Sequence, residues 1–313
     1  MTEIASTSSP DIAAPEQCAD SGTVRDRLMN AAGGFSNAEL KVVRTLLANY
    51  PAAGLTTISR LAKAAEVSDP TVLRLANRLG YDGFGDMQAA LLTEVETHMR
   101  SPLTLQPVQP APAGNPFQAV LQATLARCDE VAKGTATADY ERAVALMADP
   151  KLRLLCLGGR FSRFLAGILQ RCLHHLRPGT EFLDGSGADI SDRLADVDRR
   201  HLLIVFDYRR YQSDTVAFAR QAHARGAQVL LFTDIWRSPI ADFAALTLTA
   251  PTDTESPFDT LVSPLLQVEA VVAGLARALE AEWPDRVAAL EAIRTENRIT
   301  ITPMASEPGR RSE

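Results

Sequence analysis

The chain has 313 residues, of which 46% are hydrophobic and 22% are charged, and its formal net charge is −6. A chain of this length is expected to form two domains with separate hydrophobic cores. The acidic balance excludes a polycation, so any contact with nucleic acid must come from a local basic patch. The four cysteines are scattered and form no CxxC pair, which predicts neither a zinc site nor a disulfide framework.

The two ends of the chain have the composition of disordered tails. Residues 1–22 are rich in Ser, Pro, Ala and acidic residues, and they lack the basic segment and apolar core of a signal peptide. A helix and a second tail are expected in residues 284–313. No stretch reaches about 18 uninterrupted apolar residues, which predicts no membrane span. These features favour a cytoplasmic protein.

Prolines mark one internal boundary. Five of them lie in "SPLTLQPVQPAPAGNP", which ends at residue 116. Because proline favours extended backbone and removes a donor, residues 98–116 are predicted to form a semi-rigid linker. The linker separates an N-terminal domain, residues 23–97, from a larger domain, residues 117–283.

The N-terminal domain is predicted to be entirely helical. Ser36 and Glu39 have the spacing of a capping box at the start of one helix. Further on, residues 66–67 make a short break between two amphipathic helices. Ser68 can cap the second of these, and Pro70 suits its first turn, where a missing N–H is harmless. Two short helices joined by a tight turn predict a helix-turn-helix, whose second helix enters the major groove.

The outward face of this second helix carries side chains suited to DNA. Residues expected to contact a double-stranded operator are Arg60, Lys63, Ser68, Thr71, Arg74, Asn77 and Arg78. Arg74 can donate two hydrogen bonds to guanine, and Asn77 can pair with adenine. The other basic side chains are placed to clamp phosphates, and the hydroxyls can reach a phosphate or a base edge. The alternative is a plain three-helix bundle with a polar face.

The segment closely resembles the N-terminal domain of RpiR/MurR-family bacterial transcriptional regulators. The family pattern "VS-x-x-TV-x-R" is met by residues 67–74, and "LGY-x-GF" is met by residues 79–84. The resemblance implies a transcriptional regulator that binds DNA. Because a helix-turn-helix protein generally needs two copies to cover two half-sites, we expect a homodimer or homotetramer.

Strands alternate with helices in the larger domain. Helices are expected at residues 117–148, 162–176, 212–225 and 260–281, and strands at 152–159, 180–183, 202–206, 227–234 and 245–250. This alternation predicts a doubly wound parallel sheet. The fold class is therefore α/β overall, with an all-α helix-turn-helix bundle before a doubly wound α/β domain. The apolar length of the last helix suggests a subunit interface.

Three strands run into polar or glycine-rich loops: "LGGRFSR", "FDYRRYQSDT" and "TDIWRSP". Ligands of open α/β sheets bind at such strand ends, and the start of a helix favours negative charge. Residues expected to bind a small anionic effector are Gly158, Gly159, Arg160, Ser162, Asp207, Arg209, Arg210, Tyr211, Ser213 and Thr215. Arg209 and Arg210 either bind this anion or fill the pocket by pairing with Asp207 or a neighbouring subunit.

The order of elements resembles a SIS domain, the sugar isomerase-like fold that follows the helix-turn-helix in RpiR/MurR regulators. The family's first loop, G-x-G-x-S, is matched by Gly158 and Ser162, with Arg160 in place of the second glycine. The family's second loop, S-x-S-G-x-T, is replaced here by residues 207–211, "DYRRY". The resemblance implies that the domain senses a small anionic metabolite, either a phosphosugar or a sugar acid.

An isomerase of this fold would need a positioned base. Surface or packing roles are expected for all five histidines, His98, His174, His175, His201 and His223. Glu269 lies on a predicted helix and is expected to be solvated. We therefore expect a regulator without catalytic residues, metal or cofactor. The alternatives are a sugar-phosphate isomerase with an accessory domain and a regulator with a vestigial pocket.

Overall fold

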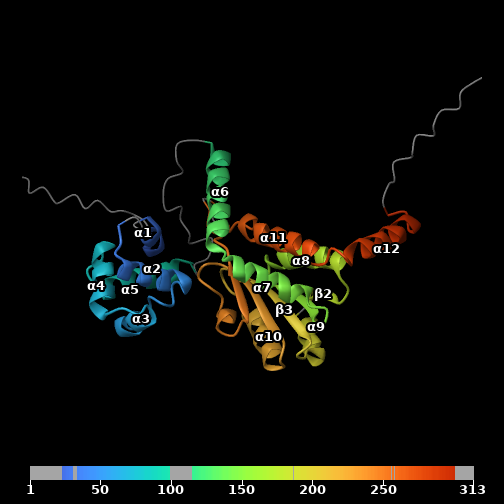
Figure 1. The fold of residues 1–313 in the computed structure, drawn as a ribbon, viewed down its shortest axis with the longest axis horizontal. Coiled ribbons are helices and arrows are strands. Elements are labelled where there is room, and N and C mark those ends of the chain that lie inside the picture. The colour runs from blue at the N-terminus through green and yellow to red at the C-terminus, as the bar shows by residue number, and fades with distance from the viewer. Residues whose placement is uncertain are drawn as a thin grey trace, which may run out of the picture. The chain divides into compact units, whose positions relative to one another are not determined.

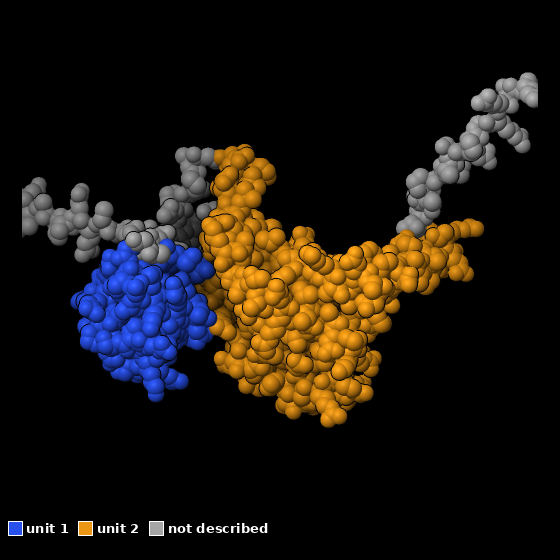
Figure 2. Space-filling model, viewed as in Figure 1, with its two compact units in different colours: residues 1–94 blue, residues 95–313 orange. Residues whose placement is uncertain are grey.

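Figure 1 shows the computed structural model of the chain. It describes residues 23–30, 34–98, 115–185, 187–254, 256 and 258–299. The chain divides into two compact units, residues 1–94 and 95–313 (Figure 2). The expected tails and most of the expected linker lie outside the described residues.

The first unit is helical, as predicted. Its helices are α1 (Val24–Asn30), α2 (Asn37–Ala48), α3 (Ile58–Ala64), α4 (Asp69–Arg78) and α5 (Phe84–His98). The capping box before α2 is confirmed, because Ser36 Oγ accepts from Glu39 N at 3.3 Å while Ser36 N donates to Glu39 Oε2 at 2.8 Å. These two bonds satisfy donors that a helix start leaves open.

Helices α3 and α4 form the predicted helix-turn-helix. Ser68 precedes α4 with extended dihedrals (φ −86°, ψ 152°), although its side chain makes no capping hydrogen bond. Pro70 lies in the first turn, where no intrahelical donor is needed. The buried face of α4 includes Val72, Leu75 and Ala76, each fully buried. Apolar packing on one side thus leaves the opposite side of α4 exposed.

The second unit contains a five-stranded parallel sheet, which confirms the predicted fold class. Its strands are β1 (Arg153–Gly158), β2 (Thr180–Phe182), β3 (His201–Asp207), β4 (Gln228–Thr233) and β5 (Leu246–Thr249). Their order is β2-β1-β3-β4-β5. After β2 the chain crosses to the other side of β1, so the strand order reverses between β1 and β3. Ligands of doubly wound sheets bind at such a switch point.

The second unit also contains helices, some of which cover the two faces of this sheet (Figure 1). They are α6 (Pro116–Gly134), α7 (Thr137–Ala148), α8 (Arg163–Leu176), α9 (Gly187–Asp192), α10 (Ser213–Ala224), α11 (Val262–Ala278) and α12 (Trp283–Glu296), with short 3-10 turns η1 (Arg193–Asp196) and η2 (Pro239–Asp242). One core joins α7, α8 and α11 to the sheet, and a second joins α10, η1 and η2 to its other face. All seven residues of β3 are buried, because this central strand is covered on both sides.

Two local features differ from or go beyond the expected elements. The single helix predicted over residues 117–148 is two helices, because Thr135 leaves helical conformation with φ −86° and ψ 113°. Arg177 is buried at the end of α8, where its Nη1 donates to the carbonyls of Met147 at 2.6 Å and Asp149 at 2.8 Å. Its Nη2 donates to Leu152 O at 2.6 Å. Burial lowers the pKa of this guanidinium, which satisfies three carbonyls between α7 and β1.

No single helix of the described residues is long and apolar enough to cross a membrane. Helices α11 and α12 reach the required length and hydropathy only as a pair, and they are bent by 107° with respect to each other.

Candidate functional site

The exposed side of the helix-turn-helix collects polar and basic side chains. Arg60, Lys63, Ser68, Arg74 and Asn77, all expected to contact DNA, are exposed. No carboxylate among the described residues forms an ion pair with the three basic side chains of this group. Their charge is therefore available to a phosphate or a base edge.

Thr71 does not lie on this exposed side, and the expectation that it faces outward is wrong. It is only 4% exposed, because it lies one turn before Leu75 on the buried face of α4. Its Oγ1 lies 3.1 Å from Ser68 Oγ and accepts from Arg74 Nη2 at 3.2 Å. Thr71 therefore holds the Arg74 side chain rather than reaching DNA itself.

Arg78 is engaged within the N-terminal unit. Its Nη1 lies 3.2 Å from Glu39 Oε2, and its Nη2 donates to Gly34 O. Its guanidinium carbon is 5.4 Å from the centroid of the Phe35 ring. The hydrogen bonds from Ser36, and secondarily the charge of Arg78, lower the pKa of Glu39. A phosphate would have to compete with these contacts, so Arg78 ties α4 to the start of α2.

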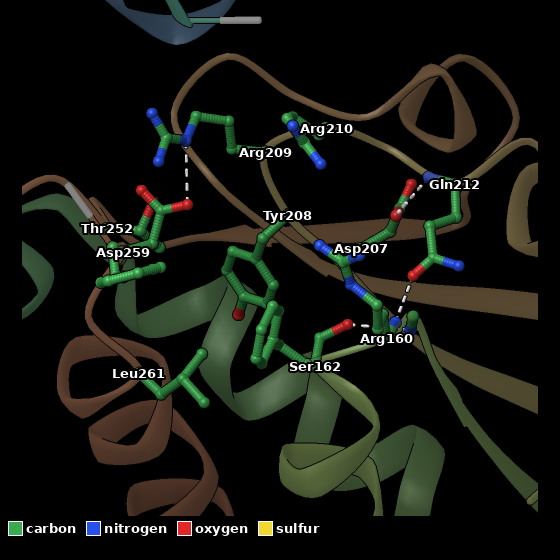
Figure 3. A pocket seen from close by; sticks show the side chains of 13 residues that line it. Arg160, Ser162, Asp207, Tyr208, Arg209, Arg210, Gln212, Thr252, Asp259 and Leu261 are labelled. Carbon is green, nitrogen blue, oxygen red and sulfur yellow. Dashed lines mark hydrogen bonds and ion pairs between the residues drawn. The ribbon is translucent and has the colours of Figure 1, made fainter. Parts of the chain in front are cut away.

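A cavity of about 510 Å³ opens in the second unit beyond the carboxyl ends of β1 and β3 (Figure 3). Pockets for small molecules commonly have volumes of about 300–1,000 Å³. Its lining residues are Gly159, Arg160, Phe161, Ser162, Asp207, Tyr208, Arg209, Arg210, Gln212, Thr252, Phe258, Asp259 and Leu261. The cavity lies at the topological switch point, where the sequence places the first two polar loops.

Six of the ten expected effector-binding residues line this cavity: Gly159, Arg160, Ser162, Asp207, Arg209 and Arg210. The other four, Gly158, Tyr211, Ser213 and Thr215, do not. A Cβ on Gly158 would lie 2.5 Å from Arg163 N, so this glycine serves the packing of β1 against α8. Tyr211 turns to Asp234, to which its hydroxyl donates at 2.7 Å, and Thr215 is buried in α10.

Several lining residues were not singled out from the sequence. Phe161, Tyr208 and Gln212 stand beside expected residues within the same loops, and their proximity in the chain was the available signal. Four residues that follow β5 also line the cavity: Thr252, Phe258, Asp259 and Leu261. Their position could have been anticipated, because the carboxyl ends of parallel strands meet at one edge of a sheet.

Ser162 joins the two loops instead of presenting a free hydroxyl. Its Oγ donates to Phe206 O at 2.6 Å and accepts from Gly159 N at 2.9 Å. The side chain is buried. The single hydroxyl proton is therefore used within the protein, and the loop after β1 is fixed to the end of β3.

Gln212 connects the same loops at the surface of the cavity. Its Oε1 accepts from the backbone N of Arg160 (Figure 3), and its Nε2 lies 3.4 Å from Asp214 Oδ1. A Cβ on Gly159 would lie 2.6 Å from Gln212 Oε1. The absence of a side chain at Gly159 thus leaves room for the carboxamide.

Arg209 pairs with Asp259, not with Asp207 as one expected alternative had it. Arg209 Nε lies 2.9 Å from Asp259 Oδ2, which links the loop after β3 to the loop before α11 (Figure 3). Asp207 instead accepts from Ser238 Oγ at 2.5 Å and from Gln212 N at 3.4 Å. Burial raises its pKa to about 6, although both hydrogen bonds act in the opposite direction.

Two arginines of the cavity form no ion pair with an acidic side chain in the described part of the chain. Arg160 and Arg210 are exposed, and neither forms an ion pair with a described residue. Both residues line the cavity, one from the loop after β1 and the other from the loop after β3 (Figure 3). Arg210 has a φ of 60°, a left-handed conformation that is uncommon for a residue with a Cβ. Two unpaired guanidinium groups beside one cavity favour the binding of an anion.

The candidate bases His174, His175, His201 and Glu269 do not line the cavity. His201 begins β3, at the opposite edge of the sheet, and its Nδ1 lies 2.9 Å from Asp198 Oδ1. His174 and His175 face arginines of α12, and Glu269 is an exposed residue of α11. Within the described ranges, no group of three or more His, Cys, Asp or Glu residues could hold a metal ion.

Comparisons with known proteins agree with this geometry. A family model described as a helix-turn-helix domain of the rpiR family matches residues 23–98, and a SIS-domain model matches residues 146–274. The Vibrio vulnificus NanR protein complexed with ManNAc-6P is 19% identical, with a TM-score of 0.51, over 87% of this chain and 98% of that one. The sugar isomerase domain of an RpiR transcription factor from Sphaerobacter thermophilus is 27% identical, with a TM-score of 0.51, over 58% of this chain and 98% of that domain. No curated protein sequence matches the chain.

These findings first define a class of protein, in which a helix-turn-helix domain precedes a SIS domain. The N-terminal match then specifies the first of these domains: residues 23–98 match the helix-turn-helix domain of the rpiR family.

Proposed function

We propose that this chain is a DNA-binding transcriptional regulator controlled by a small anionic metabolite. The observation that carries the proposal is the combination of an RpiR-family helix-turn-helix with a SIS-domain cavity beside two unpaired arginines. The solved NanR structure was obtained with ManNAc-6P, an anionic sugar derivative, which supports an anionic ligand here.

The helix-turn-helix would bind a double-stranded operator through the exposed side of α4. Arg74 and Asn77 would read base edges, while Arg60 and Lys63 would contact phosphates. A homodimer or homotetramer in the cytoplasm would supply the two copies that an operator with two half-sites requires. Effector binding in the SIS domain would change operator affinity, which is a coupling between two distinct sites.

The DNA-binding part is tested with Arg74. The full chain is used to select its preferred DNA from a random pool, and binding to that sequence is measured by fluorescence anisotropy. Arg74→Ala should weaken specific binding by about 1–3 kcal/mol, and Arg74→Lys should lose selectivity while keeping the charge. If both variants bind the selected DNA as tightly and selectively as the wild type, α4 does not read the operator through this residue.

The effector part is tested with the arginines of the cavity. A thermal-shift screen against phosphosugars, sugar acids and amino acids should identify an anion that stabilises the wild type. A double Arg209→Ala, Arg210→Ala variant should lose this shift and still bind DNA. Arg225→Ala removes an exposed arginine from the far end of α10 and serves as the control. A normal response in the double variant would assign these two arginines a structural role.

One observation favours the enzymatic alternative, a sugar-phosphate isomerase. Asp207 lines the cavity with a pKa raised to about 6 by burial, and such groups occur at catalytic sites. Both of its oxygens accept hydrogen bonds from Ser238 and Gln212, which holds the carboxyl in the wall of the cavity. Turnover of phosphosugars by the purified chain, abolished by Asp207→Asn, would establish this alternative. A pocket that binds no anion would instead indicate the vestigial form.

A further inference from the structure

The loop after β1 has two backbone donors that already have partners. Near the start of a helix, backbone N–H groups are a common binding site for phosphate. Here Gly159 N donates to Ser162 Oγ at 2.9 Å, and Arg160 N donates to Gln212 Oε1. Side-chain oxygens of the chain itself therefore occupy the positions at which phosphoryl oxygens could bind.

The position of Gln212 is supported from three sides. Its backbone N donates to Asp207 Oδ1 at 3.4 Å, and its Nε2 lies 3.4 Å from Asp214 Oδ1. The third support is the space left by Gly159, where a Cβ would lie 2.6 Å from the carboxamide oxygen. A phosphoryl group could reach Arg160 N only after the Gln212 side chain had moved away.

The charges around the cavity distinguish between anions. The Gln212 carboxamide accepts a hydrogen bond without a negative charge, so it leaves Arg160 and Arg210 without an anionic partner. Asp259 is paired with Arg209, so Asp207 is the lining carboxyl that disfavours a doubly charged ligand group more than a singly charged one. The planar fork of a guanidinium matches the two oxygens of a carboxylate.

Tyr208 has a buried hydroxyl beneath the cavity. This residue lines the cavity and is 8% exposed, yet its hydroxyl has no hydrogen-bond partner among the described residues. Buried polar groups usually have a partner, so this phenol is an exception, and a ligand oxygen could reach it only after a neighbouring side chain had moved.

We propose that Gln212 determines the specificity of this pocket: it closes the backbone-amide site to phosphoryl groups, so that the effector carries a carboxylate held by Arg160 and Arg210. This inference rests on the proposed function in that it assumes an anionic effector in the SIS domain. It narrows that effector to the sugar-acid type, and it makes Gln212 the residue whose removal should restore phosphate binding.

The test compares two probes with the same sugar ring, glucuronate and glucose 6-phosphate. Their dissociation constants for the full chain are measured by calorimetry. The wild type should prefer glucuronate, and Gln212→Ala should shift the ratio of the two constants toward glucose 6-phosphate by about tenfold or more, equivalent to ~1.4 kcal/mol. Gln212→Glu keeps an oxygen at the same reach and should show no gain in phosphate affinity. Equal melting temperatures of the variants confirm that they fold.

The proposal is overturned if the wild type prefers glucose 6-phosphate, or if the ratio is the same in the wild type and Gln212→Ala. The proposal is also overturned if neither probe binds to the wild type or to Gln212→Ala. Operator binding, measured on the same preparations, keeps the two proposals separate. An unchanged ratio together with normal operator binding refutes only the role of Gln212. If the wild type binds no operator DNA, the proposed function as a transcriptional regulator is refuted.

Discussion

Asp207 gives the sharpest prediction about stability. Its carboxyl is 1% exposed at the end of β3, and burial raises its pKa from 3.8 to about 6. Between these two values the native state binds more protons than the unfolded state, so the free energy of unfolding must fall as the pH rises. Asp207→Asn removes the titration and should remove this fall.

The magnitude follows from the size of the pKa shift. A shift of about two units at ~1.36 kcal/mol per unit corresponds to about 3 kcal/mol. This stabilisation is fully present below about pH 4 and is lost as the pH rises through about 6. The asparagine amide would also face the N–H of Gln212, which costs about 1–3 kcal/mol at every pH. That cost is a constant offset and leaves the pH dependence unchanged.

The assay uses the two tryptophans of the chain, Trp236 and Trp283, which both lie in the second unit. Urea unfolding of the wild type and Asp207→Asn is followed by their fluorescence at several values between pH 4 and 7. The difference in unfolding free energy should move by about 3 kcal/mol in favour of the variant across this range. Asp214→Asn, at an exposed position nearby, should follow the wild type.

Parallel curves for the wild type and Asp207→Asn would refute the reasoning. They would mean that the carboxyl has the same proton affinity in the folded and unfolded chain, and that its hydrogen bonds fully compensate for burial.

Two further predictions concern arginines that hold the fold together. Arg78→Ala removes the ion pair with Glu39 and should destabilise the N-terminal unit by about 1 kcal/mol. The measurement is amide hydrogen exchange of α2 and α4 in the full chain. Unchanged protection would show that the pair is solvated and weak. Arg177→Met keeps the side-chain length but leaves three carbonyls without a donor. The free energy of unfolding of the second unit, followed by tryptophan fluorescence, should therefore fall by about 3 kcal/mol or more. A decrease below ~1 kcal/mol would show that water replaces the guanidinium.

The order of elements could be predicted because its signals are local. Apolar runs gave the strands, and caps such as Ser36 and Ser68 gave helix starts within a residue of those observed. The break at Thr135 was missed because apolar residues continue on both sides of it. The polarity of Thr71 favours an exposed position, but its place one turn before Leu75 puts it on the buried face of α4.

The candidate site could be predicted only in outline. The edge of the sheet follows from topology, so the loops after β1 and β3 were correctly expected to meet. Side chains of these loops pair with residues that are far away in the sequence: Arg209 pairs with Asp259, and Gln212 accepts a hydrogen bond from Arg160. Nothing in the local sequence indicates such pairs, because they depend on how separate loops pack.

The two adjacent glycines after β1 are subject to different constraints. A Cβ at Gly158 would meet the backbone of Arg163, which cannot move aside, whereas one at Gly159 would meet only the end of the Gln212 side chain. In an alignment of related sequences, position 158 should therefore be invariant. Positions 159 and 212 should covary, with a larger residue at 159 wherever 212 is small. The residues at positions 159 and 212 of related sequences would then indicate which members bind a phosphoryl group and which bind a carboxylate.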